Sequence, residues 1–289
     1  MAIIAIAIMS AARAHETAGT TSHWTIDPFV VAPLLASGIL YALGTVALWR
    51  RAGVDRGIRL WQAAAYAGGW LALAGALISP LHWLGEHLFT AHMIEHEIVM
   101  AVAAPLLASC RPLAAMMWAL PKVLRGGAGA LVRSKPIALA WRALTRPVNA
   151  TLAHGIAIWL WHAPPVFDAA VENLMLHRLQ HLSFLVTGLL FWWSLFRRAE
   201  PGAAVGHLFV TMLHMSVLGA LIALAPHVFY RVQTADALAF GLTPLQDQQL
   251  AGLVMWVPAG TIYAGAALVF AAVWIARSGR APLLREPAR

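Results

Sequence analysis

The sequence predicts an all-α, polytopic membrane protein, a bundle of seven transmembrane helices, and its composition carries this prediction. Of the 289 residues, 61% are hydrophobic and only 11% are charged, whereas soluble proteins have about 45–50% and about 25%. Apolar helices of about 20 residues cross a membrane, and the sequence lacks the alternating ten-residue segments of a transmembrane barrel. We therefore expect the apolar segments to be helices.

Seven long apolar stretches supply these helices and form one membrane domain, residues 24–276. They are residues 28–49, 58–79, 89–110, 148–163, 174–196, 203–225 and 250–276. The last stretch is preceded by a helix-start pattern, because Thr243 and Gln246 have the spacing of a capping box around Pro244. Asp247 then lies in the first turn of that helix.

Three segments fall outside the apolar stretches. Residues 1–14 are apolar and end in Ala-Arg-Ala, so they are either a signal peptide or a short apolar terminal segment. Residues 111–147 combine prolines, tryptophans and seven basic residues, which predicts an amphipathic connection on the inner leaflet. Residues 277–289 form a basic tail that we expect in the cytoplasm.

The basic residues predict the orientation of the helices. With the N-terminus outside and the C-terminus inside, 17 of the 20 lysines and arginines fall in inner segments. This is the side on which membrane proteins concentrate positive charge. The net charge of +8 therefore reflects orientation and contact with membrane lipid, and we expect no nucleic acid as partner. The one cysteine, Cys110, excludes an intrachain disulfide and a CxxC motif.

Two pairs of histidines are the strongest candidates for a functional site. His92 and His96 are four residues apart, as are His177 and His181, so each pair lies on one face of its helix. Both pairs fall near the outer ends of their helices in the predicted orientation. Imidazole binds copper, zinc, iron and nickel, and facing helices of a bundle are a common frame for a metal site. Two facing pairs therefore predict a metal or cofactor site.

Other residues near these pairs are weaker candidates. Glu95 is either a ligand or a carboxylate that orients a histidine ring, and Met93 adds a thioether suited to copper. His82, His87, His162 and His227 taken singly fit residues of the membrane interface. His154 and His214 fall near the middle of the bilayer, where they either ligate a haem or hydrogen-bond between helices.

Several known catalytic motifs are absent. The sequence has no GxGxxG after a strand, no P-loop and no GxSxG. The run HMIEH at residues 92–96 is also not the HExxH of zinc proteases, because its glutamate precedes the second histidine. No residue spacing in the sequence therefore supports these catalytic chemistries.

The motifs around the histidines resemble a known family. They are HMIEH at 92–96, WHAPPVFD at 161–168, HRLQH at 177–181 with GLLFW at 188–192, and DQQLAGLVMWVP at 247–258. In this order they resemble the CtaG family of cytochrome c oxidase assembly factors, the polytopic Bacillus type that serves caa-type oxidases. The similarity runs from about residue 24 to residue 276.

The resemblance implies a protein of the bacterial inner membrane that helps to assemble a haem-copper oxidase. It implies histidine-rich faces at His92, His96, His177 and His181, with His162 and Asp247 nearby, and oxidase subunits as partners. The hypothesis that follows is an assembly factor that binds copper at the outer face and supplies it to the oxidase. Two alternatives stay open: a membrane-bound di-metal or haem-binding oxidoreductase, and a metal cation transporter.

Overall fold

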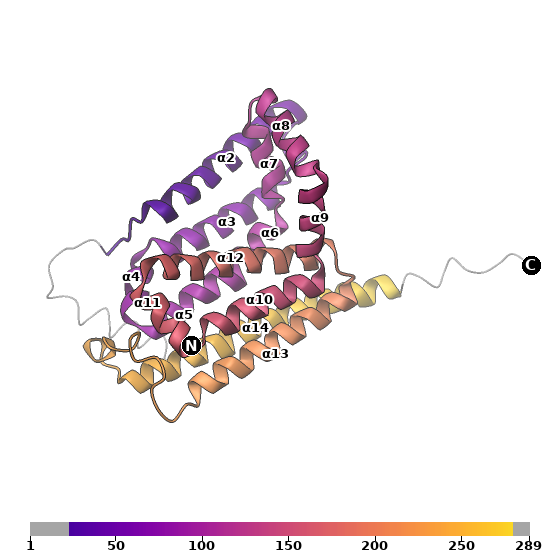
Figure 1. The fold of residues 1–289 in the computed structure, drawn as a ribbon. Coiled ribbons are helices and arrows are strands. Elements are labelled where there is room, and N and C mark those ends of the chain that lie inside the picture. Colours follow the sequence, from indigo (N-terminus) through magenta and orange to yellow (C-terminus); the bar gives the residue numbers. More distant parts are fainter. Residues whose placement is uncertain (1–22, 280–289) are drawn as a thin grey trace, which may run out of the picture.

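The computed structural model describes residues 23–279, and these form a bundle of α-helices with no β-strand (Figure 1). The all-helical class expected from the composition is thus confirmed for the described part of the chain. The prediction for residues 1–14, a signal peptide or a short apolar terminal segment, lies outside the described residues, as does most of the cytoplasmic tail predicted at 277–289.

The long helices of the bundle follow the apolar stretches. They are α2 (Pro28–Ala52), α3 (Leu60–Leu77), α10 (Pro147–Trp161), α12 (Leu174–Arg197), α13 (Pro201–Ala223) and α14 (Pro244–Ser278). The third stretch is divided into α5 (Phe89–Glu97), the π-helix η1 (Ile98–Ala103) and α6 (Ala104–Ser109). Shorter elements are α4 (Pro80–His87), α7 (Pro112–Ala119), α8 (Lys122–Arg133), α9 (Lys135–Leu144), α11 (Pro164–Glu172) and the 3₁₀-helix η2 (Ala237–Phe240).

Five helices within residues 23–279 are long and apolar enough to cross a membrane, and a sixth if α3 and α4, which meet at a 44° bend, form one span. The seventh expected span corresponds to α10. This helix has only 15 residues, which at about 1.5 Å per residue fall short of a hydrocarbon core of about 30 Å. α10 nevertheless packs against α12 and α13 with one face, while Leu152, Ile156 and Leu160 on the helix are exposed. The count of seven and the orientation therefore stay predictions.

Helix starts follow local rules that the sequence displays. The expected capping box at the start of α14 is confirmed, because the Thr243 hydroxyl accepts from the Gln246 backbone and the Gln246 side chain accepts from the Thr243 backbone. Proline occupies the first turn of most of the long helices. Backbone N–H groups in the first turn make no hydrogen bond within the helix, so a proline there costs none.

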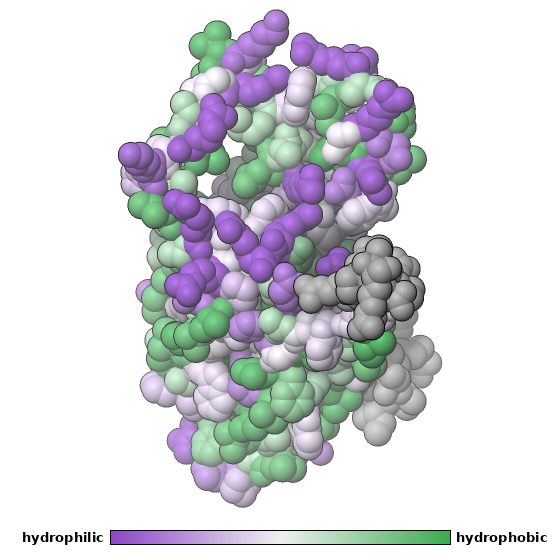
Figure 2. Space-filling model, turned by 90° about the vertical axis from the view of Figure 1, so that its right-hand side faces the viewer, coloured by the Kyte–Doolittle hydropathy of each residue, from purple (hydrophilic) through white to green (hydrophobic). Residues whose placement is uncertain are grey.

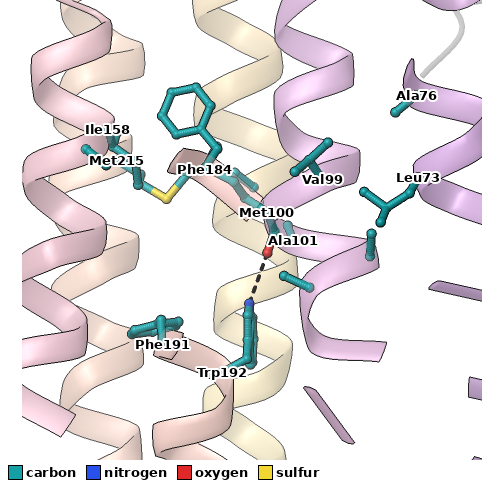
Figure 3. Packing of buried hydrophobic residues seen from close by; sticks show 14 of the residues in the cluster. Leu73, Ala76, Val99, Met100, Ala101, Ile158, Phe184, Phe191, Trp192 and Met215 are labelled. Atoms are coloured by element: carbon teal, nitrogen blue, oxygen red, sulfur yellow. Dashed lines mark hydrogen bonds between the residues drawn. The ribbon is translucent and has the colours of Figure 1, made fainter. Parts of the chain in front are cut away.

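A proline also explains the π-helix in the third stretch. The N–H of Ala104 donates to the carbonyl of Val99, five residues earlier. Pro105 has no N–H to continue this pattern, so the carbonyl of Met100 is left free. It accepts the indole N–H of Trp192 on α12, at 3.0 Å (Figure 3). The irregular turn is therefore tied to the neighbouring helix inside the core.

Small residues bring α13 and α14 close together. A Cβ added to Gly219 would lie 2.8 Å from the backbone nitrogen of Trp256, and one on Gly252 would overlap the backbone nitrogen of Ala223. Helices in membranes commonly associate through such small-residue faces, because close backbones gain van der Waals contact. This crossing lies alongside the buried cluster in which Met215, Ile158 and Phe184 gather (Figure 3).

The two ends of the bundle differ in character. α4, α11 and the start of α5 lie at one end, and α8 and α9 lie at the other (Figure 1). Both α8 and α9 are amphipathic and bury no residue. Figure 2, which views the molecule from that side, shows hydrophilic side chains gathered over it. The connection 111–147 therefore folds as helices at one end, and its contact with the inner leaflet stays a prediction.

Candidate metal centre

Asp247 fixes the position at which α5 begins. Its carboxylate accepts the backbone N–H groups of Phe89 and Thr90, at 2.8 and 2.9 Å, and the Thr90 hydroxyl, at 2.7 Å. A carboxylate at a helix N-terminus satisfies unpaired N–H groups and favours the positive end of the helix dipole. Asp247, which the resemblance placed near the histidines, thus joins the first turn of α14 to the first turn of α5.

Both histidine pairs point their rings into one cluster. The rings of His92 and His96 on α5 are 4.3 Å apart between centroids, and those of His177 and His181 on α12 are stacked at 4.6 Å. Across the two helices, the His96 and His181 rings are 5.0 Å apart, and the His92 and His177 rings 5.3 Å. The two faces expected from the spacing therefore meet in the structure.

His92, His96 and His181 form the tightest part of this cluster. One ring nitrogen from each lies within 4.8 Å of the other two, and all three residues are buried. None of their six ring nitrogens has a hydrogen-bond partner. Buried polar atoms without partners are costly, and a metal ion would satisfy one nitrogen of each ring. Zinc–nitrogen bonds are about 2.0–2.1 Å long, so small side-chain rotations would complete a three-histidine site.

Glu95 and His82 extend the cluster toward α4. The buried Glu95 carboxylate places Oε2 3.3 Å from His82 Nδ1 and 3.9 Å from His181 Nε2, while its Oε1 has no partner. A Cβ on Gly85 of α4 would lie 2.8 Å from Cδ of Glu95, so the glycine leaves the room that this carboxylate occupies. Taken singly, His82 fits a residue of the membrane interface in the sequence, because no residue spacing relates α4 to α5 or α12.

His162 lies beside the three buried histidines. It is the C-cap of α10 and is buried, with its ring 5.7 Å from that of His96. Its Nδ1–H donates to the carbonyl of Ile158 at 2.7 Å, which leaves Nε2 as the acceptor, and Nε2 has no partner. The hydroxyl of Tyr230 donates to the His162 carbonyl at 2.6 Å and holds this end of α10 in place. Met93, the weak thioether candidate, is buried in the hydrophobic core.

His154 and His214, which the sequence predicts near the middle of the bilayer, lie outside this cluster and are hydrogen-bonded between helices. The Thr187 hydroxyl donates to the Ser183 carbonyl, so it accepts from His154 Nδ1, at 3.1 Å. His154 Nε2 then accepts from the hydroxyl of Tyr263, at 3.4 Å. His214 Nδ1 accepts the indole N–H of Trp159, at 3.4 Å. These contacts are of the kind that joins membrane helices.

A cavity of about 580 Å³ borders the cluster on one side. Its walls come mainly from α2, α3 and α12 and are largely apolar, and His82, His177 and His181 lie at its polar end. The Asp27 carboxylate accepts two hydrogen bonds from the Arg178 guanidinium at this end, at 2.7 and 2.9 Å. Burial acts to raise the pKa of Asp27, but the hydrogen bonds from Arg178 and from the Phe29 backbone outweigh it and lower that pKa.

Sequence similarity to known proteins covers most of this chain. A family model described as cytochrome c oxidase caa3 assembly factor matches residues 39–277. Uncharacterized proteins of Mycobacterium bovis and Mycobacterium tuberculosis are each 26% identical to the chain over 250 residues. These alignments cover 81% of the chain and 36% of each relative, so the chain spans about a third of the length of the curated relatives it matches. No solved structure matches the chain.

The family match includes every histidine of the cluster described above. It also agrees with the resemblance that the motifs from residue 92 to residue 258 indicate in the sequence. The chain belongs to the cytochrome c oxidase caa3 assembly factor family.

Proposed function

We propose that this protein binds a copper ion at His92, His96 and His181 and supplies it during assembly of a caa3-type cytochrome c oxidase. The observation that carries the proposal is the group of three buried histidines, from two helices, whose ring nitrogens have no partner. A haem-copper oxidase needs copper as well as haem, and imidazole is a good copper ligand. The family description names the oxidase, and the three histidines are the candidate ligands of the ion.

The geometry suits a site that releases its ion. Three protein ligands leave a coordination position open, through which a ligand from a recipient protein can attack. The apolar surroundings, which include Phe167 and Phe184 beside the histidine rings, exclude water and competing ligands. We propose further that the cluster faces the outer side of a bacterial inner membrane, because the basic residues concentrate toward the opposite ends of the helices in sequence.

Metal analysis of the purified protein tests the proposal. After incubation with copper(I) and removal of free metal, the native chain is expected to retain roughly one ion, since one three-histidine site holds one ion. The variant His92→Ala plus His181→Ala should retain almost none. His227→Ala is the matched control, because His227 is exposed and its ring contacts Phe229 outside the cluster. Equal and negligible copper in the native chain and the double variant would refute the site.

The same preparation separates the alternative functions. A di-metal or haem oxidoreductase would consume dioxygen with a reductant or show a Soret band. A transporter would carry copper into proteoliposomes, and His214→Ala would stop this uptake. A non-enzymatic assembly factor shows none of these, while cells that produce only the double variant contain oxidase depleted in copper.

A further inference from the structure

We propose that His82, Glu95 and His177 form a second metal position, through which the ion passes on its way to and from His92, His96 and His181. The proposal rests on the proposed function, because it requires that the three buried histidines hold a metal. We call this second position, formed by side chains between α4 and α12, the entrance.

Glu95 connects the two positions. The same oxygen, Oε2, is 3.3 Å from His82 Nδ1 and 3.9 Å from His181 Nε2. The His82 ring is 5.7 Å from that of His177 and 6.0 Å from that of His181. An ion held by His82 and Glu95 is therefore one ligand exchange away from His181, and it never has to leave polar ligands for the apolar interior, where a bare charge is very costly.

Exposure falls along this line of side chains. The exposed fraction falls from 46% for the side chain of Glu86 to 14% for His82 and 0% for Glu95, and the next side chain, His181 of the inner position, is 9% exposed. Glu86 is 4.0 Å from His82 Nε2, so a carboxylate stands at the outer end of the series. His92 and His96, at the inner end, are buried. The cavity is lined by His82 and His177 of the proposed entrance and by His181 of the inner position, but not by His92 or His96, so an ion arriving through it meets these three histidines before the two innermost ones.

The ligand types of the outer position fit transient binding better than tight binding. Two imidazoles and one carboxylate form a mixed nitrogen and oxygen set, whereas the buried position has three imidazoles. Soft metals such as copper(I) prefer nitrogen and sulfur ligands to carboxylate oxygen. The ion should therefore bind the outer position more weakly and move on to the inner one. His177 is suited to this step, since its Nε2 has no partner and its ring is stacked on that of His181.

Metal-loading kinetics test the entrance directly. The metal-free full chain in detergent is mixed with copper(I) held by a coloured chelator, and transfer is followed over time. His82→Ala should still bind copper at equilibrium, but it should take up and release the ion about tenfold more slowly or worse, the scale of losing one tuning residue at a metal site. Gly85→Ala removes no ligand, yet its Cβ must displace the Glu95 carboxylate, and it should slow transfer in the same way. His227→Ala is the control and should match the native chain.

The outcomes separate this proposal from the proposed function. If the native chain binds no copper, the proposed function fails and the entrance fails with it. If His82→Ala and Gly85→Ala both transfer copper at the native rate, the entrance is wrong while the buried site stands. Loss of equilibrium binding in a His82→Ala protein with native thermal stability would make His82 a ligand of the main site and overturn the entrance. Should His82→Ala not fold, Gly85→Ala alone decides the question.

Discussion

His92 and His96 lie one turn apart on α5, and His177 and His181 lie one turn apart on α12. These local relations follow from helix geometry, so the sequence predicts which face each pair occupies. His82 and His162 reach the cluster differently, one from α4 and the other from the end of α10. Their positions depend on packing between distant segments, which no residue spacing encodes. The sequence therefore predicts the centre of the candidate site better than its surroundings.

Asp247 offers a test at the same scale. In the structure its carboxylate accepts three hydrogen bonds from Phe89 and Thr90. Asp247→Ala should therefore lower the free energy of unfolding by roughly 1–3 kcal/mol, the usual cost of removing a charged acceptor from buried donors. Thermal unfolding followed by circular dichroism in detergent measures the effect.

The control for Asp247 is Asp236→Ala, because the Asp236 side chain makes no cap hydrogen bond to η2. If Asp247 has a structural role, Asp247→Ala should be less stable than the native chain. It should still bind copper at the native level at low temperature, where the variant stays folded. A protein of native stability that has lost its copper would instead identify Asp247 as a ligand.

At the scale of elements, the sequence predicts helices well and their interruptions poorly. Residues 89–110 read as one apolar helix, but the structure divides them into α5, η1 and α6. Pro105 signals a disturbance, and only the contact between Met100 and Trp192 shows how it is accommodated. In the same way, the bend between α3 and α4 brings His82 to the cluster, and its one local sign in the sequence is Ser79 followed by Pro80, a typical helix start.

The attachment of α2 should depend on pH. Asp27, the N-cap of α2, is ion-paired with Arg178 of α12, and its pKa is lowered in the folded protein. A carboxyl group of this kind stabilises the fold above its unfolded pKa of about 3.9, and the stabilisation is lost as the pH falls through the lower folded value. Acidification below about pH 4 should thus loosen the end of α2 that carries Asp27.

Asp27→Asn should have the same effect at neutral pH, because it removes the charge and keeps the size. A cysteine placed at Ser37, which lines the cavity, would then react faster with a small maleimide than in the parent. Asp55→Asn is the control, since Asp55 lies at the other end of α2. Identical labelling rates in Asp27→Asn and the parent at every pH would show that the ion pair does not hold α2.

At the scale of the whole molecule, charge placement predicts the orientation. The single native cysteine, Cys110, is buried, so introduced cysteines can be labelled in the native background. Arg231→Cys, at an exposed position between α13 and α14, should react with a membrane-impermeant maleimide in intact cells. Arg133→Cys, at the end of α8, should react only after the membrane is opened. Labelling in the reverse order would reverse the orientation and move the histidine cluster to the inner side.

The length of α14 has a consequence for how the protein sits in a bilayer. Its 35 residues span about 50 Å at 1.5 Å per residue, whereas its partner α13, with 23 residues, matches a hydrocarbon core of about 30 Å much more closely. Because the two helices are packed side by side, the tilt of α14 cannot absorb the mismatch independently. We therefore expect its final turns, with Arg277, to project into the aqueous phase. That projection lies at the opposite end of α14 from Asp247, so a fluorescent label or a fused domain placed there would leave the histidine cluster undisturbed.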